Sequence, residues 1–227
     1  MIATVLIILS FSPNRMPIKV KEMSTWLAFS MKNSHEISKF IPNDTELNPI
    51  RILSSDMAEP KLLFNMYEST SPFFKGLRLE VVTIVRKKND PKSTHFVVLD
   101  CLSNTMSWDP IEGIHLPNAA ASMHTIMGSH HIECMGDFAY LKMAANLGRP
   151  QHITKNFAVD ANHLCLYRNS PNGIKLEFDE REVMKDVLLL NNVKFETNIW
   201  NAFRGRITHS FVHPHPMNFL AGMRVFK

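Results

Sequence analysis

Short apolar runs separated by polar breaks run through the middle of the chain. Residues 79–85 (LEVVTIV) are rich in β-branched side chains, which favours a strand, and the polar run 86–93 (RKKNDPKS) favours a turn. The apolar run 95–101 (HFVVLDC) predicts a second strand, and 106–109 (MSWD) is expected to return beside it after a turn at 102–105. The pattern therefore predicts consecutive strands and hairpins here.

Apolar residues in the flanking regions recur at helical spacing. In residues 135–147 (MGDFAYLKMAANL), Phe138, Leu141 and Ala145 fall on one helical face, and Gly148 with Pro150 is a typical helix stop. Three other segments predict helices: 21–39, 60–67 and 182–190. Helices before and after the strands predict an α+β fold, with a central, mostly antiparallel sheet flanked by helices.

Length and composition predict one domain. The chain has 227 residues and is 45% hydrophobic, enough for one sizeable core. We expect this domain to cover residues 21–227, with 1–20 as an apolar N-terminal extension or an alternative start at Met16. The apolar run 2–11 lacks a preceding basic region and is too short to span a bilayer as a helix. We therefore expect no integral membrane span.

Charge and cysteine content indicate which partners, compartment and metals to expect. The net charge is +4, the pI is near 9.0, and there is no long Lys/Arg stripe, so we expect no nucleic-acid partner. Three cysteines without close-spaced pairs indicate a reducing compartment. A zinc site would have to combine His131 and Cys134 with His163 or Cys165, which matches no zinc-finger spacing, so we expect no metal.

Three residues suggest cysteine chemistry: His95, Asp109 and Cys134. His95 opens a predicted strand, Asp109 ends the predicted partner strand, and Cys134 lies where the predicted helix 135–147 begins. A helix N-terminus stabilises a thiolate, an imidazole can take the thiol proton, and a carboxylate can orient the imidazole. Glu112 is an alternative to Asp109 as the orienting acid.

These segments resemble the CE clan of cysteine catalysts. The histidine-led hairpin (THFVVLDC, then MSWDP) and the cysteine before an apolar segment (IECMGDFAYLKMA) look most like the YopJ-type effector acetyltransferases, in which an acidic residue, here Glu133, directly precedes the cysteine. The resemblance covers roughly residues 79–147. It implies a helix–sheet fold, with His95 as general base, Asp109 as its orienting acid and Cys134 as nucleophile.

The resemblance also implies a function. Cys134 would take acetyl from acetyl-CoA and transfer it to Ser, Thr or Lys of a host signalling protein, with inositol hexakisphosphate as an activator and secretion by a bacterium into the host cytoplasm. A protease of the same clan, acting on ubiquitin-like or peptide substrates, is an alternative. Because residues 125–133 (TIMGSHHIE) hold no glutamine to serve as an oxyanion-hole donor, a catalytically decayed interaction protein is another.

Overall fold

The chain folds almost entirely as β-structure. The computed structural model describes residues 16–72, 74–109, 113–154, 164–167, 172–178 and 186–225. Strands make up 66% of the structure and helix 4%. The predicted α+β fold of the CE clan, with helices flanking a sheet, is therefore wrong: the described helical structure is one α-turn and one short 3-10 helix.

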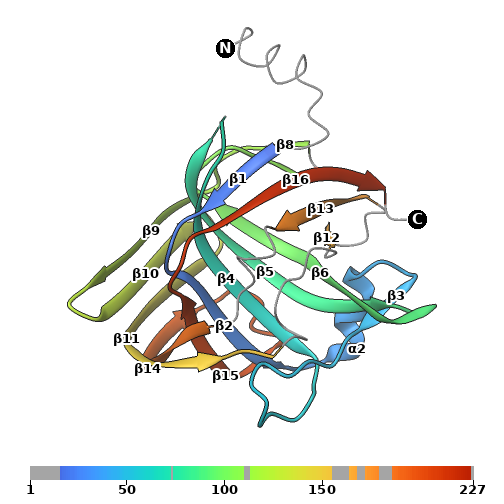
Figure 1. The fold of residues 1–227 in the computed structure, drawn as a ribbon, viewed down its shortest axis with the longest axis horizontal. Helices are drawn as coiled ribbons and strands as arrows, with labels where there is room; N and C mark the ends of the chain where they lie inside the picture. The colour runs from blue at the N-terminus through green and yellow to red at the C-terminus, as the bar shows by residue number, and fades with distance from the viewer. Residues whose placement is uncertain are drawn as a thin grey trace, which may run out of the picture.

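The elements are mostly strands (Figure 1). They are β1 (Met16–Val20), β2 (Ser24–Met31), α2 (Ser34–Ile37), the 3-10 helix η1 (Ser38–Phe40), β3 (Thr45–Leu47), β4 (Lys61–Thr70), β5 (Lys75–Lys87), β6 (Asp90–Ser103), β7 (Ser107–Asp109), β8 (Gly113–His115), β9 (Ala119–Ile126), β10 (Ser129–Gly136), β11 (Tyr140–His152), β12 (Leu164–Tyr167), β13 (Asn172–Phe178), β14 (Asp186–Thr197), β15 (Arg204–His213) and β16 (Met217–Val225). The strands pair antiparallel except for β12, which runs parallel to β6.

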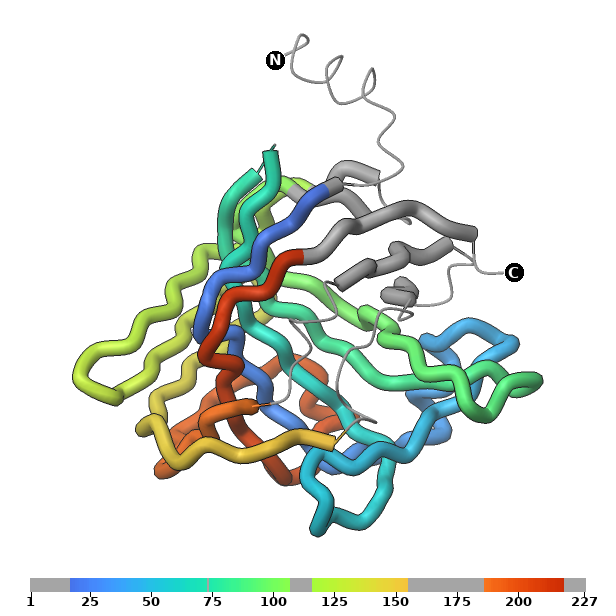
Figure 2. Tube along the Cα trace, in the orientation of Figure 1, coloured from blue at the N-terminus to red at the C-terminus, as the bar shows by residue number. Residues whose placement is uncertain are grey.

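Fourteen of these strands form one sheet, which closes on itself at one side. The order is β3-β5-β6-β12-β13-β16-β1-β4-β2-β15-β14-β11-β10-β9, and β4 also pairs with β5. The pairings β4–β5, β5–β6, β6–β12, β12–β13, β13–β16, β16–β1 and β1–β4 therefore form a closed ring, which we call the barrel. Outside this ring, β3 pairs with β5, and the other strands continue from β4 through β2 and end in the β9–β10 hairpin, which projects from the body (Figures 1 and 2).

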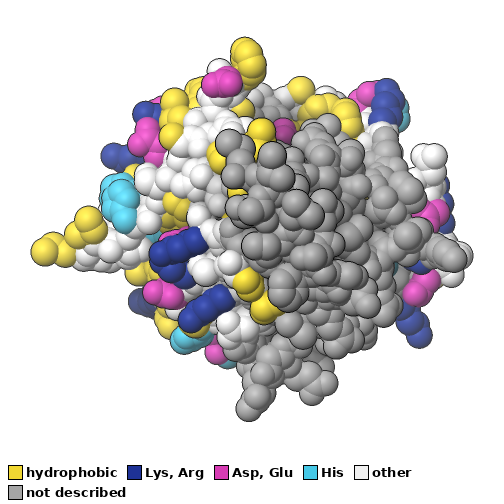
Figure 3. All heavy atoms as spheres, turned by 90° about the horizontal axis from the view of Figure 1, so that it is seen from above, with side chains coloured by type: hydrophobic (Ala, Val, Ile, Leu, Met, Phe, Trp, Pro, Cys, Tyr) yellow, Lys and Arg dark blue, Asp and Glu magenta, His cyan; other side chains and the backbone are white. Residues whose placement is uncertain are grey.

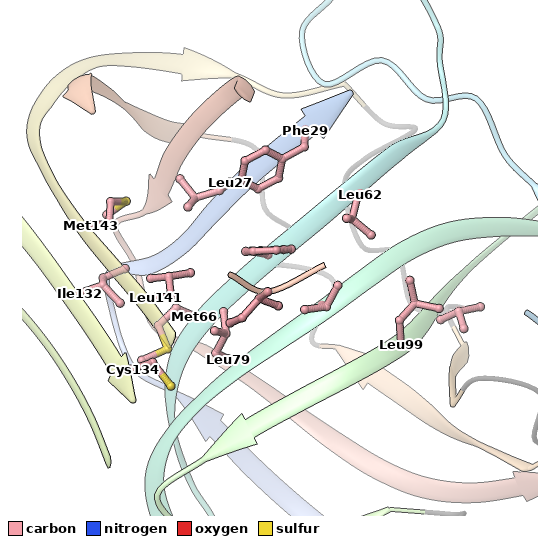
Figure 4. Packing of buried hydrophobic residues seen from close by; sticks show 14 of the residues in the cluster. Leu27, Phe29, Leu62, Met66, Leu79, Leu99, Ile132, Cys134, Leu141 and Met143 are labelled. Carbon is pink, nitrogen blue, oxygen red and sulfur yellow. The ribbon is translucent and has the colours of Figure 1, made fainter. Parts of the chain in front are cut away.

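Two hydrophobic cores lie on opposite faces of the central strands. On β4, Leu62 and Phe64 belong to the first core, whereas Leu63, between them, belongs to the second. The first core packs the central strands against β10, β11 and β14 (Figure 4). The second combines residues of the barrel strands β1, β4, β5, β6 and β16 with residues of β2, β14 and β15, and it lies on the interior face of the barrel strands. Central strands buried on both faces are rich in consecutive apolar residues.

The predicted strands at 79–85 and 95–101 are confirmed. They lie within β5 and β6, which pair as an antiparallel hairpin with Val85 opposite His95. The prediction that residues 106–109 return beside the strand 95–101 is wrong. Residues 107–109 form β7, which pairs with β8, while β6 pairs with β5 and β12. Asp109 is opposite Gly113, so the hairpin that was expected to bring it to His95 does not form.

The predicted helices are wrong wherever the structure describes them. Residues 60–67 lie almost wholly in β4, and 21–39 contain β2 and the α-turn. Residues 135–147 hold the end of β10, a turn and most of β11, where Leu141, Met143 and Ala145 are buried at a period of two. Residues 179–185 lie outside the described part, and β14 begins at Asp186.

His130 on β10 ties the projecting hairpin to β2. The Thr25 hydroxyl donates to the carbonyl of Met23 (3.0 Å), so it accepts from Nε2 of His130 (2.7 Å). Nδ1 of His130 then accepts from the Thr125 hydroxyl (2.8 Å). Burial, with His131 and His124 nearby, lowers the pKa of His130 to about 4. The buried ring is therefore neutral and bonded at both nitrogens.

The pKa of His130 predicts a pH-dependent stability. In the unfolded chain the imidazole binds a proton below about 6.5, but in the fold only below about 4. Stability should therefore fall as pH drops from 6.5 to 4, with a slope from this group of up to about 1.4 kcal/mol per pH unit. Urea unfolding across that window should show a shallower dependence for His130→Gln. The exposed-residue variant His35→Gln should keep the wild-type slope; an unchanged slope in His130→Gln would contradict the assignment.

Candidate functional site

The interior face of the barrel carries polar side chains beside its apolar core. On β4 the residues at alternate positions from Leu63, which are Asn65, Tyr67 and Ser69, share its interior face. The register places Arg78 of β5 opposite Tyr67, and Glu80 opposite Asn65. Neighbouring strands thus place a set of polar groups on the same interior face.

A buried ion pair is the centre of this set. Glu80 is 8% exposed and Arg78 7% exposed. Oε1 of Glu80 accepts from Nε of Arg78 (3.1 Å), from Nη2 of Arg78 (2.9 Å) and from the Tyr67 hydroxyl (2.8 Å). All three donors use one carboxylate oxygen. The other oxygen, Oε2, has no hydrogen bond among the described residues, so the carboxylate keeps an acceptor for a further donor.

Two other buried polar atoms on this face have no hydrogen-bond partner within the described residues. They are Oγ of Ser69, which is opposite Val20 of the second core, and Nδ1 of His213. His213 is opposite Ser24 on β2, and the Ser24 hydroxyl donates to Oδ1 of Asn65 (3.2 Å). Burial lowers the pKa of His213, which favours the neutral ring. Buried polar atoms normally find partners, and those that lack one often mark a water or ligand position.

An apolar wall adjoins the polar groups. The rings of Trp26 on β2 and Phe96 on β6 pack together with centroids 6.1 Å apart, and both residues belong to the second core. Trp26 is opposite Asn65 in the β2–β4 register, so the aromatic wall begins beside the polar set. Aromatic and aliphatic walls with a few convergent polar groups are typical of small-molecule sites.

A second polar chain lies at the other end of β4. The Lys61 ammonium is bonded to Glu59 and donates to Oγ1 of Thr208 (3.0 Å). Thr208 sits in an irregularity of the β15–β2 register, and Oγ1 of Thr208 also contacts Nδ1 of His209 (3.3 Å). Nε2 of His209 bonds Asp56 (3.1 Å). This chain of side chains fixes β15 to β4 and to the segment before it.

That segment covers the second core. Oδ2 of Asp56 accepts from the backbone N–H groups of Ile52 (3.0 Å) and Leu53 (2.7 Å). Ile52, fully buried, and Ile50 both pack into the second core. We therefore assign a structural role to the Asp56–His209 contact, which holds this segment over the barrel. The candidate functional site is the polar set around Arg78 and Glu80.

Cys134 lies in a strand, not at a helix start. It is in the middle of β10, opposite Leu141 on one side and Ala121 on the other, and its side chain packs in the first core (Figure 4). It is fully buried, and burial raises the pKa of its thiol to about 11. The helix N-terminus that was expected to activate this thiol is absent, and its surroundings favour the protonated form.

The strands of the proposed triad are not neighbours. His95 is buried in β6, which pairs with β5 and β12, whereas β10 pairs with β9 and β11. The backbone of Asp109 is in β7, and its side chain, like Glu112, lies outside the described residues. Neither the sheet order nor the register brings His95 and Cys134 together. Cys134 is a free thiol.

The sequence contained a signal for the barrel site that the triad hypothesis passed over. Glu80 falls inside the apolar run 79–85, and Arg78 precedes that run by one residue. Charged residues are rarely buried unless they are paired, so two opposite charges two positions apart in a buried strand indicate an interior ion pair. Tyr67 and Asn65 were assigned to a helix, which concealed their common face with the pair.

The structure carries neither a multi-residue metal group nor a membrane-spanning helix in its described part. No three His, Cys, Asp or Glu side chains of the described ranges are placed to hold one metal ion. No described helix has the length and apolar character needed to cross a bilayer. The roles expected for acetyl-CoA and inositol hexakisphosphate stay untested predictions. They were implied by the resemblance to the CE clan, whose α+β fold this chain does not have.

No protein-family model and no curated protein matches this sequence. Its function must therefore be argued from the chemistry of its own residues.

The burial of Cys134 predicts poor thiol reactivity. Raising the thiol pKa from 9.0 to about 11 lowers the thiolate fraction about a hundredfold, and burial also blocks the reagent. In the folded protein, iodoacetamide should label Cys134 far more slowly than in urea, as followed by peptide mass spectrometry. Equal rates in the folded and unfolded protein would restore the case for a reactive thiol.

Proposed function

We propose that this protein binds a small organic molecule inside the barrel. The molecule has a head group that donates hydrogen bonds, such as an amine or a hydroxyl, and an apolar body. The head group binds Oε2 of Glu80, and the body packs against the wall formed by Trp26 and Phe96. The observation that carries the proposal is the Arg78–Glu80 pair, which is buried in the barrel while one carboxylate oxygen keeps no donor among the described residues.

The energetics of the pair support this assignment. Burying two charges costs desolvation energy that their mutual attraction only partly offsets, so an apolar pair of similar volume often serves stability as well or better. A buried ion pair that Tyr67 holds in one orientation is therefore better explained by a role in ligand recognition than by a contribution to stability. Because the three donors on Oε1 fix the carboxylate plane, Oε2 points in a defined direction.

The neighbouring groups fit the same ligand. Ser69 and His213 each offer a buried polar atom without a hydrogen-bond partner within the described residues, on the face that holds Glu80. A hydroxyl and a neutral imidazole can each accept or donate, so they suit a head group with more than one polar atom. Arg78 and Glu80 carry opposite charges that offset each other.

A fluorescent amine tests the proposal. 1-Aminoanthracene has an amine head group and an apolar ring body, and its emission rises in apolar surroundings. We expect wild type to bind it, and Glu80→Gln to bind it about ten- to a hundredfold more weakly, because a hydrogen bond to a charged group contributes about 1.5–3 kcal/mol. Glu80→Gln keeps the side-chain volume, so circular dichroism should show an unchanged fold.

The matched control is Glu133→Gln. Glu133 is an exposed carboxylate on β10, paired with Lys142 at 2.8 Å, outside the barrel. Its variant should bind the probe as wild type does. The proposal is wrong if folded wild type does not bind the probe, or if the Glu80 and Glu133 variants bind it equally.

A further inference from the structure

The strand β9 leaves one edge of the sheet open. It is the last strand in the sheet order and pairs with β10 alone, and no described residue pairs with its outer edge. Its sequence, AAASMHTI, contains neither a charged residue nor a proline. Those are the features by which edge strands usually avoid pairing with other chains. This edge is therefore fit to accept another strand.

The turn of the hairpin fixes which backbone groups point outward. Met127 (φ 49°) and Gly128 (φ 78°) form a two-residue turn of the I′ type, with Ile126 opposite Ser129. Ile126 therefore exchanges its hydrogen bonds with β10, and by alternation so does His124. The N–H and C=O groups of Met123 and Thr125 then point away from β10.

The start of β9 is already occupied, which limits the open edge. Nδ2 of Asn104 donates to the carbonyl of Ala121 (3.3 Å). Like the backbone groups of Met123 and Thr125, this carbonyl points away from β10. The N–H of Asn118 donates to the carbonyl of Ser103 (2.9 Å). The open part of the edge thus begins after Ala121 and has its centre at His124.

The open edge is complementary to itself. An antiparallel copy of β9 placed about a two-fold axis at His124 sets Met123 opposite Thr125 of the second copy, and Thr125 opposite its Met123. Both residues of each pair have outward-pointing groups, so each pair forms two hydrogen bonds. We propose that β9 pairs in this register with β9 of a second copy of this chain, making a two-fold dimer with a continuous sheet.

The side chains around the edge favour a second copy as the occupant. Ile126 is 60% exposed and Met127 fully exposed, and they form an apolar tip on the projecting hairpin (Figure 3). In the proposed register, Ile126 packs over Ser122 of the second copy. His124 stacks on His131, with ring centroids 5.2 Å apart, and faces its own counterpart at the axis. No charge of either sign lies on the strand to oppose a like strand.

A cysteine crosslink tests the register. The two His124 residues form a non-hydrogen-bonded pair, with Cβ atoms about 4.5–5.5 Å apart, so the two cysteines of His124→Cys can form a disulfide with a small adjustment. In the same dimer the two Ser122 residues are about 13 Å apart, because they are separated by four residue steps along the strands. Under mild oxidation His124→Cys should give a covalent dimer, while Ser122→Cys and wild type should not.

A charge variant tests the interface without a crosslink. His124→Glu sets two carboxylates opposite each other at the axis, which destabilises strand pairing, whereas His131→Glu puts the same charge one strand away. Light scattering after size exclusion should give twice the chain mass for wild type and His131→Glu, and the single-chain mass for folded His124→Glu. A monomeric wild type, equal crosslinking of the two cysteine variants, or a dimeric His124→Glu would each overturn the proposal.

Discussion

Burial of both faces of β4 and β5 is the constraint on which the rest of the structure depends. One face of these strands packs in the first core, against β10, β11 and β14, and the other packs in the second core on the barrel side. The central residues of these strands, 62–64 of β4 and 79–85 of β5, are therefore buried whichever way their side chains point. Burying a polar group in such strands costs free energy unless the group is hydrogen-bonded. The few polar residues on these strands therefore mark positions with a structural or functional role.

The two ends of β4 show two outcomes of that constraint. At its start, Lys61 reaches Glu59 and Thr208, and nearby Asp56 and His209 complete a chain of bonds that holds the covering segment in place. Near its end, Tyr67 meets the Arg78–Glu80 pair, whose remaining acceptor has no described partner. The first arrangement is self-contained, whereas the second keeps an acceptor oxygen that a donor from outside the chain could use. This difference is why the ligand site is assigned to the second.

The outer sheet follows a different rule. In β11, β10 and β9 only one face is covered, so inward residues such as Ile132 and Cys134 alternate with more exposed ones. That alternation buries Cys134 among apolar side chains and raises its thiol pKa, which removes the helix-start chemistry that the resemblance to a cysteine catalyst required. It also carries the sheet outward to an edge, where the backbone groups of Met123 and Thr125 are exposed.

Local patterns in the sequence determined the β5–β6 hairpin, because β-branched runs on either side of a polar turn encode that unit without help from distant residues. They did not determine β4 or β11, whose apolar residues fit a helical spacing as well as a strand of period two. Only tertiary structure decided these, since β4 is a strand by virtue of its partners β1, β2 and β5. The site was hidden for the same reason: Arg78 and Glu80 are close in sequence, but Tyr67 and His213 reach their interior face only through pairing across the sheet.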